Sequence, residues 1–373
     1  MALVNSVDPV AAQPALRDTL ARKLSGVSDV SVSDVFTSKA SGLSTETVMF
    51  TASWTFDGQP VRRDLVARVA PKGPGLFVEY DLPLEARVMA ALSEHTPVRV
   101  PQILCQEDDP ALLGAPFFVM ERIAGRSSSD DPPFTVTGWL FDLTPERQRT
   151  LYDNALEAFA AIPQVDPVAL GLGDIGRYPS SDGDPLTGQI EHWERAFGWA
   201  TDGAPNPYVE AGFDWIRANR PRDPEPLTLS WGDAGIRNMV FASDLSVAAV
   251  IDWEQVSLGS PELDLGWWFA ALRLFSDGIG IPQLPGFRSR AETIAAYEKL
   301  TGLTVRHIDF YEAFSYLRLS VAMIRGARML IAGGALPPEA GMEFNNPATR
   351  LLAELTGAEP PTEDSQYFIG NRN

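Results

Sequence analysis

The stretch "LSWGDAGIRNMVF", Leu229 to Phe241, carries residues that can do chemistry. It places a carboxylate, Asp233, five residues before a carboxamide, Asn238, and an apolar run follows. A turn at "ASDLS" leads to a second apolar run that ends at Asp252, in "VAAVIDWEQ". Two strands joined by a tight turn would bring Asn238 and Asp252 to the same end of a hairpin. The sequence therefore predicts that three oxygen-bearing side chains converge.

Such a set suits phosphoryl transfer. Carboxylate and amide oxygens are good ligands for Mg²⁺, which takes one or two protein ligands together with substrate phosphates. A separate carboxylate, Asp233, could orient a hydroxyl and accept its proton as it attacks a γ-phosphoryl group. Taken alone, Asp233 also fits a turn aspartate, and Asn238 fits a loop amide that caps its own backbone. Their order and spacing together with Asp252 favour the catalytic interpretation.

Composition limits the function classes. The chain has 373 residues, of which 45% are hydrophobic, which is enough for two domains or one large bilobed unit. The formal charge of −19 disfavours nucleic acid and anionic membranes as partners, and it would serve solubility or attract a cationic substrate. The single cysteine, Cys105, excludes an intrachain disulfide and a thiolate metal cluster. With no secretory leader pattern and no apolar stretch near 18 residues, we expect a soluble cytoplasmic protein, and its oligomeric state stays open.

The first third of the chain is rich in β-forming residues. The segments "VSVSDVFT", "ETVMFTASWTF" and "DLVARVA" predict strands, and "DGQP" predicts a hairpin turn between the last two. Helical spacing is found in "PALRDTLARKL" and "PLEARVMAALSEH", while "APFFVMERI" predicts a further buried strand. After the polar segment "RSSSDDPPF", "TPERQRTLYDNALEAFAAI" begins a mainly helical remainder, with Thr144 and Pro145 as N-cap and first helical residue.

The motif "WGDAGIRN", followed by "VIDWEQVSLGSPELDLGWW", resembles the paired motifs of aminoglycoside phosphotransferase-like and choline kinase-like small-molecule kinases. The resemblance is closest to the branch found with acyl-CoA dehydrogenases, and it extends from about Val30 to "FNNPATRLLAEL". It implies an α+β, protein kinase-like bilobed fold. Residues 1–122 would form a β-rich lobe that binds nucleotide, and residues 123–373 a larger, mainly helical lobe for catalysis and acceptor binding.

The same resemblance implies roles for individual residues. Asp233 would be the catalytic base, and Asn238 and Asp252 would hold Mg²⁺. Asp264, in "ELDLGWW", would brace the catalytic loop, although an acid in the first turn of a helix is the plainer interpretation. Trp231 replaces the family histidine, so its single N–H donor would brace the loop differently.

Two neighbouring features are left open or without a role. Arg237, where many relatives have glycine, is either a phosphate or substrate contact or a solvated side chain, and the solvated interpretation is favoured. The tryptophans of "GWWFAALRLF" are interpreted as packing residues.

Nucleotide contacts are expected in the first third. In "KASGLSTETVMF", the backbone of Ser41, Gly42 and Ser44 could approach phosphates, although the loop also fits an ordinary hairpin turn. By resemblance, Arg68 would occupy the place of the strand lysine of protein kinases with Glu85 as its partner, although Arg68 also fits an outward-facing strand residue and Glu85 an acid in the first turn of a helix.

Other residues of this lobe have weaker expectations. Lys72 is a rival phosphate contact to Arg68. By resemblance to the family hinge, backbone groups of Met120, Glu121 and Arg122 would meet the adenine edge.

The resulting hypothesis is an ATP- and Mg²⁺-dependent transfer of the γ-phosphoryl group to the hydroxyl of a small-molecule acceptor, a reaction of the EC 2.7.1 type. A metabolite such as a hydroxyacyl thioester ranks first, and "RANRPR", Arg217 to Arg222, would supply the basic site that an anionic coenzyme A ester requires. An aminoglycoside or another antibiotic ranks second. A nucleotide-binding pseudokinase is the third hypothesis, motivated by Trp231 and by Arg68 in place of lysine.

Overall fold

The structure is a computed structural model that describes residues 7–37, 44–176, 178–222 and 226–362. Ser41 and Gly42, two of the predicted phosphate contacts, lie outside the described residues. The chain divides into two compact units. Unit 1 comprises Met1–His95 and Val100–Ala124, and unit 2 comprises Thr96–Arg99 and Gly125–Asn373.

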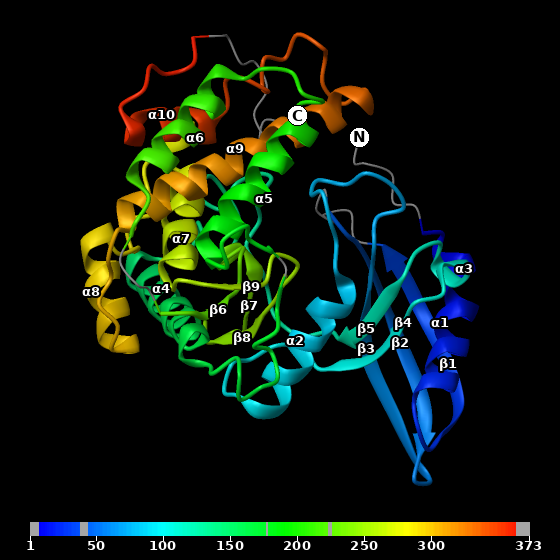
Figure 1. The fold of residues 1–373 in the computed structure, drawn as a ribbon. Helices are drawn as coiled ribbons and strands as arrows, with labels where there is room; N and C mark the ends of the chain where they lie inside the picture. Colours follow the sequence, from blue (N-terminus) through cyan, green and yellow to red (C-terminus); the bar gives the residue numbers. More distant parts are fainter. Residues whose placement is uncertain (1–6, 38–43, 177, 223–225, 363–373) are drawn as a thin grey trace. The chain divides into compact units, whose positions relative to one another are not determined.

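Unit 1 is built on a five-stranded antiparallel sheet with the strand order β1-β2-β3-β5-β4 (Figure 1). The strands are β1 (Val27–Thr37), β2 (Glu46–Phe56), β3 (Gln59–Val69), β4 (Ile103–Glu107) and β5 (Phe117–Glu121). Along β2 the buried residues Val48, Phe50 and Ala52 recur with the period of two that directs them to one face of the sheet. Helix α1 (Pro9–Lys23) packs against the sheet through Leu16 and Leu20, which are fully buried, and forms the core of the unit with it.

The connections of unit 1 follow from their residues. Asp57 and Gly58 join β2 to β3 with φ angles of 48° and 69°, the left-handed backbone that a two-residue hairpin turn requires. Helix α2 (Leu82–His95) begins after Asp81, whose Oδ1 accepts a hydrogen bond of 2.9 Å from the Leu84 N–H. The short helix α3 (Pro110–Leu113) lies between β4 and β5 in the chain.

In the residues that the structure describes, unit 2 is mainly helical and has two small antiparallel strand pairs. Its helices are α4 (Pro145–Ala160), α5 (Pro185–Ala200), α6 (Pro207–Asn219), α7 (Glu262–Leu274), α8 (Arg290–Thr301), α9 (Ile308–Ala332) and α10 (Pro347–Thr356). The 3₁₀ turns are η1 (Ile162–Gln164), η2 (Ile236–Asn238) and η3 (Asp277–Ile279). The strands pair as β6 (Thr228–Ser230) with β9 (Ser257–Gly259), and as β7 (Met239–Phe241) with β8 (Val247–Val250).

The long helix α9 is the centre of unit 2 and contacts α5, α6, α7 and α10 (Figure 1). It approaches α7 closely because Gly266 of α7 has no side chain: a Cβ at this position would overlap the backbone of Tyr311. Burial along most of α9 explains why its sequence is apolar on several faces.

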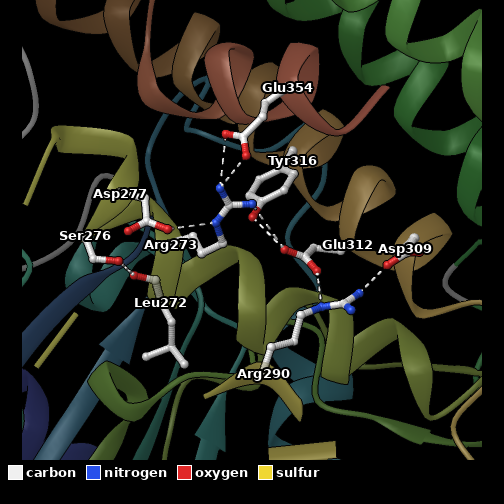
Figure 2. Close-up of polar contacts among 9 residues, drawn as sticks. All are labelled: Leu272, Arg273, Ser276, Asp277, Arg290, Asp309, Glu312, Tyr316 and Glu354. Atoms are coloured by element: carbon white, nitrogen blue, oxygen red, sulfur yellow. Dashed lines mark hydrogen bonds and ion pairs between the residues drawn. The ribbon is translucent and has the colours of Figure 1, made fainter. Parts of the chain in front are cut away.

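A buried carboxylate on α9 joins several helices through ion pairs (Figure 2). Glu312 is 2% exposed, lies 3.0 Å from Arg290 Nε of α8 and 3.8 Å from Arg273 Nη1 of α7, and accepts a hydrogen bond of 2.8 Å from the Tyr316 hydroxyl. Arg273 also pairs with Glu354 of α10 at 3.0 Å. The network therefore ties α7, α8, α9 and α10 together around one buried charge.

The predicted fold class is confirmed: an antiparallel β-rich unit precedes a mainly helical one. The predicted N-terminus of α4 is also present, since Thr144 caps the helix and Pro145 is its first residue. No helix among the described residues is long and apolar enough to cross a membrane.

Candidate active site

The loop that follows β6 is held in place by hydrogen bonds to Asp264 of α7. Asp264 Oδ1 accepts hydrogen bonds from the Ser230 hydroxyl at 2.9 Å and the Gly232 N–H at 2.8 Å, and Oδ2 accepts one of 2.6 Å from the Trp231 N–H. Burial raises the pKa of Asp264, whereas these three donors lower it. Asp264 thus acts on the shape of the loop through these contacts, and it is at the same time an acid in the first turn of α7, so both interpretations of the sequence hold.

Trp231 and Gly232 complete the support of the loop. The fully buried Trp231 indole donates from Nε1 to the carbonyl oxygens of Ile251 and Asp252, at 3.0 and 3.1 Å. Gly232 has a φ of 88°, and a Cβ at this position would overlap the carbonyl group of Gln255. Trp231 therefore braces the loop against the segment that carries Asp252, through the one donor that its side chain has.

The Asp233 carboxylate receives donors on both oxygens. Oδ1 is bound by the Arg237 guanidinium and by Trp267 Nε1, the latter at 2.6 Å, and Oδ2 accepts a hydrogen bond of 2.9 Å from Asn238 Nδ2. The Asp233 side chain is 12% exposed. Hydrogen bonds on both oxygens hold the carboxylate in one orientation.

Arg237 is not solvated, so the interpretation favoured from the sequence is wrong. Its side chain is 19% exposed, its Nη2 pairs with Asp233, and its Nη1 lies 3.3 Å from Asp130 Oδ2. Burial alone would lower the pKa of this guanidinium, but the charges of Asp233, Asp130 and Asp252 raise it, so the cation is retained. Asp130, in the polar segment "RSSSDDPPF", was not a candidate in the sequence.

Two further residues that support Asp233 were missed. Trp267, interpreted from the sequence as a packing residue, donates directly to Asp233. Arg318 of α9 is 3% exposed, lies 4.3 Å from the centre of a Trp267 ring, and donates from Nη2 to the Gly232 carbonyl oxygen at 3.0 Å. Both come from helices distant in sequence from the loop, and no local pattern marks them.

The β7–β8 hairpin brings Asn238 and Asp252 together, as predicted. Met239 pairs with Val250, and the Ile251 N–H donates to the Asn238 carbonyl oxygen at 2.9 Å. Asp252 follows at a φ of 64°. Asn238 turns its Nδ2 toward Asp233, which leaves Oδ1 at the other end of the amide as the atom suited to a cation. One amide oxygen and one carboxylate fit the small protein share of a Mg²⁺ site.

Unit 1 contains the second set of candidates. Arg68 Nε on β3 lies 3.1 Å from Glu85 Oε1 on α2, and the two side chains are 11% and 1% exposed. The rival Lys72 is exposed, with its side chain against Gly114. Ser44 is half-buried and lies two residues before the start of β2.

Two backbone N–H groups of the predicted hinge already have hydrogen-bond partners. The Glu121 N–H donates to the Gln102 carbonyl oxygen at 2.9 Å, and the Arg122 N–H donates to that of Asp64 at 3.0 Å. Met120, half-buried, pairs with Val66 on β3. These two N–H groups are therefore engaged within unit 1, and neither is open to an adenine edge.

Comparison with known proteins places the chain in a family. The family described as "Phosphotransferase enzyme family" (APH) matches residues 41–303. "Probable acyl-CoA dehydrogenase IBR3" of Arabidopsis thaliana is 31% identical over 310 residues, which are 78% of this chain and 36% of that protein. The chain thus spans about a third of the length of this relative.

Crystal structures show the same fold. A Ralstonia eutropha protein assigned as an aminoglycoside phosphotransferase matches 92% of this chain and 96% of its own, with a TM-score of 0.68 at 24% identity. A thermostable mutant of aminoglycoside phosphotransferase APH(4)-Ia, in a ternary complex with ADP and hygromycin B, matches 93% of this chain and 99% of its own, with a TM-score of 0.54 at 16% identity. The chain belongs to the phosphotransferase enzyme family, a family of small-molecule kinases.

Proposed function

We propose that this chain transfers the γ-phosphoryl group of ATP to a hydroxyl of a small molecule, with Asp233 as the base. The observation that carries the proposal is the asymmetry of the Asp233 carboxylate. Oδ1 is occupied by Arg237 and Trp267, whereas among the described residues Oδ2 receives only Asn238 Nδ2. A carboxylate oxygen accepts two hydrogen bonds, so Oδ2 is the atom with a lone pair for an incoming hydroxyl.

The reaction follows from that atom. The acceptor hydroxyl donates its hydrogen to Asp233 Oδ2 and attacks the γ-phosphorus. The new oxygen–phosphorus bond forms as the bond to the β,γ-bridging oxygen breaks, ADP leaves, and the proton moves to Oδ2. Asp264, Trp231 and Arg318 keep the loop in place, so most of the catalysis is positioning.

The metal ligands in this proposal are Asn238 Oδ1 and the Asp252 carboxylate. A Mg²⁺ ion held there would neutralise charge on the nucleotide phosphates. The support is the hairpin register, which fixes the two residues beside each other, and the orientation of the Asn238 amide.

Unit 1 would supply the nucleotide contacts. Arg68, oriented by Glu85, is suited to the α- and β-phosphates because its planar fork can bind two oxygens. We also propose phosphate contacts for Ser44 and, outside the described residues, for Ser41 and Gly42. Carbonyl groups of Met120, Glu121 and Arg122 would meet the adenine amino group.

For the acceptor we propose a metabolite hydroxyl, with hydroxyacyl thioesters first. The support is the similarity to a relative named as an acyl-CoA dehydrogenase. An antibiotic acceptor is the second candidate, supported by the ternary complex with hygromycin B of a protein with the same fold.

The predicted basic site does not strengthen either candidate. A cavity of about 540 Å³ is lined by Arg217, Arg220 and Arg222. Arg217 pairs with Glu194 at 2.7 Å, and Arg220 pairs with Asp184. Two of its three arginines are therefore compensated by acids.

The proposal is tested first by nucleotide binding. Calorimetric titration with ATP in the presence and absence of Mg²⁺ should show binding that Mg²⁺ strengthens, and Asp252→Ala should remove the Mg²⁺-dependent part. Asp244→Ala is the matched control, because this exposed aspartate lies in the turn of the same hairpin. If Asp252→Ala left the Mg²⁺ dependence intact, the metal assignment would be wrong. Binding by the wild type without turnover of any acceptor would favour the pseudokinase.

A further inference from the structure

The segment that follows residue 124 is held by hydrogen bonds against the β7–β8 hairpin, which carries Asn238 and Asp252 at its ends. The Arg126 N–H donates to the Phe241 carbonyl oxygen and the Phe241 N–H donates back to Arg126, both at 2.9 Å. Gly125 permits this approach, because a Cβ there would overlap Val240 and Phe241. The segment therefore packs beside the β7–β8 hairpin. It brings Asp130 next to Arg237, although the two residues are 107 positions apart in the sequence.

Arg237 lies between two carboxylates. One terminal nitrogen, Nη2, pairs with Asp233 Oδ1, and the other, Nη1, lies 3.3 Å from Asp130 Oδ2. The guanidinium is planar, so fixing both terminal nitrogens fixes its plane. Among the described residues, Arg237 Nε and Asp130 Oδ1 are buried without a hydrogen-bond partner, so no other observed bond holds either group.

We propose that Arg237, anchored by Asp130, is a positioning residue for the catalytic base. The inference rests on the proposed function of Asp233. With Asp130 on one side, the guanidinium holds Asp233 Oδ1 and turns Oδ2 toward the acceptor. Arg237 acts through Asp233, and Asp130 acts through Arg237.

The anchor is needed because Arg237 by itself has two ways to bind Asp233. Without Asp130, the guanidinium could rotate about its Nε–Cζ bond or bind both Asp233 oxygens side by side, which is the common geometry of an arginine–carboxylate pair. Side-by-side binding would engage Oδ2, the oxygen proposed as the base. Asp130 therefore protects the oxygen that must accept the proton.

Kinetics of four variants test the role. Arg237→Gln should lower kcat by about 10- to 100-fold, the scale of a misplaced reacting group, with the acceptor KM changed by less than about twofold. Asp130→Asn should lower kcat to a smaller degree, and the double variant should be no slower than Arg237→Gln, because Asp130 acts only through Arg237. Arg237→Lys keeps the positive charge but lacks the two terminal nitrogens of the guanidinium, so its kcat should stay close to that of Arg237→Gln. The control is Asp142→Asn, an exposed aspartate of the same part of the chain.

A second measurement detects the restrained Arg237 guanidinium and does not require turnover. In protein labelled with ¹⁵N-arginine, Arg237 should give two separate Nη signals because rotation about Nε–Cζ is hindered, whereas the exposed Arg147 should give averaged signals. In Asp130→Asn the Arg237 signals should also average.

The outcomes separate the claims. A raised acceptor KM with unchanged kcat in Arg237→Gln would show a substrate contact instead of a positioning residue. Averaged Arg237 signals in an active wild type would contradict the restraint of Arg237 by Asp130, but not the proposed function of Asp233. A hindered Arg237 in a protein that turns over no acceptor would contradict the proposed function and the positioning role with it.

Discussion

Gly232 offers the sharpest test of how the loop holds Asp233. It precedes Asp233 directly and has a φ of 88°, in the left-handed region that side-chain-bearing residues avoid. A Cβ at this position would overlap the carbonyl oxygen, carbonyl carbon and Cβ of Gln255, most of which are backbone atoms that cannot rotate away. We therefore expect Gly232→Ala to destabilise the protein and to displace Asp233.

The magnitude follows from two costs. The left-handed backbone costs alanine about 1 to 2 kcal/mol relative to glycine. Overpacking against a fixed backbone adds about 1 to 3 kcal/mol. The expected loss in the free energy of unfolding is thus about 2 to 5 kcal/mol. If the loop shifts by about 1 Å to relieve the overlap, the misplaced Asp233 would lower kcat by about 100-fold.

Gly235 of the same loop is the matched control. Its φ is −174°, which any residue adopts, and a Cβ would have its nearest contact at 3.7 Å, from the Arg237 side chain. Urea denaturation of Gly232→Ala and Gly235→Ala, with kcat measured for each, compares a strained and an unstrained insertion of one methyl group. Equal stability and equal kcat for the two variants would refute the proposed strain at Gly232.

Three further predictions follow from other parts of the structure. Burial raises the pKa of Cys105 to about 11, so the thiol should stay neutral and resist alkylation at pH 8 in the folded protein and react on unfolding in urea; rapid labelling of the native protein would contradict this. Glu312→Ala removes the buried carboxylate shared by Arg290, Arg273 and the Tyr316 hydroxyl and should cost about 3 kcal/mol by urea denaturation, whereas the control Glu354→Ala, at the exposed end of the network, should cost less than about 1 kcal/mol. Trp267→Phe keeps a ring over Arg318 but removes the donor to Asp233 Oδ1, and it should lower kcat by about 10- to 100-fold, since a hydrogen bond to a charged group contributes about 1.5 to 3 kcal/mol; an unchanged kcat would show that Arg237 alone holds that oxygen.

The local part of the site could be predicted because short connections leave the chain few choices. A tight turn between two apolar runs fixes where their outer ends meet, and this gave the juxtaposition of Asn238 and Asp252. β-forming residues placed Arg68 in a strand and helical spacing placed Glu85 in a helix, whereas their pairing was implied by the resemblance to kinases.

The contacts that orient Asp233 could not be predicted in this way. Trp267 and Asp130 reach the loop from 34 residues after Asp233 and 107 residues before Arg237. Trp267 lies in an apolar helix, where a tryptophan is usually a packing residue. Asp130 lies in a polar, proline-bearing segment, where an aspartate is usually exposed to solvent. Arg237 was misjudged for the same reason: an arginine in a loop is usually solvated, and the acid that reverses this preference is remote in sequence.

The central claim is that Asp233 is the base of a phosphoryl transfer to a small-molecule hydroxyl. The most direct measurement is Mg·ATP consumption by the purified protein with hydroxyacyl-CoAs, aminoglycosides, macrolides and amino alcohols as acceptors, with Asp233→Asn alongside. We predict turnover with one acceptor class and its loss in Asp233→Asn, which keeps the shape of the side chain but removes its charge. Turnover that survives in Asp233→Asn would contradict the claim.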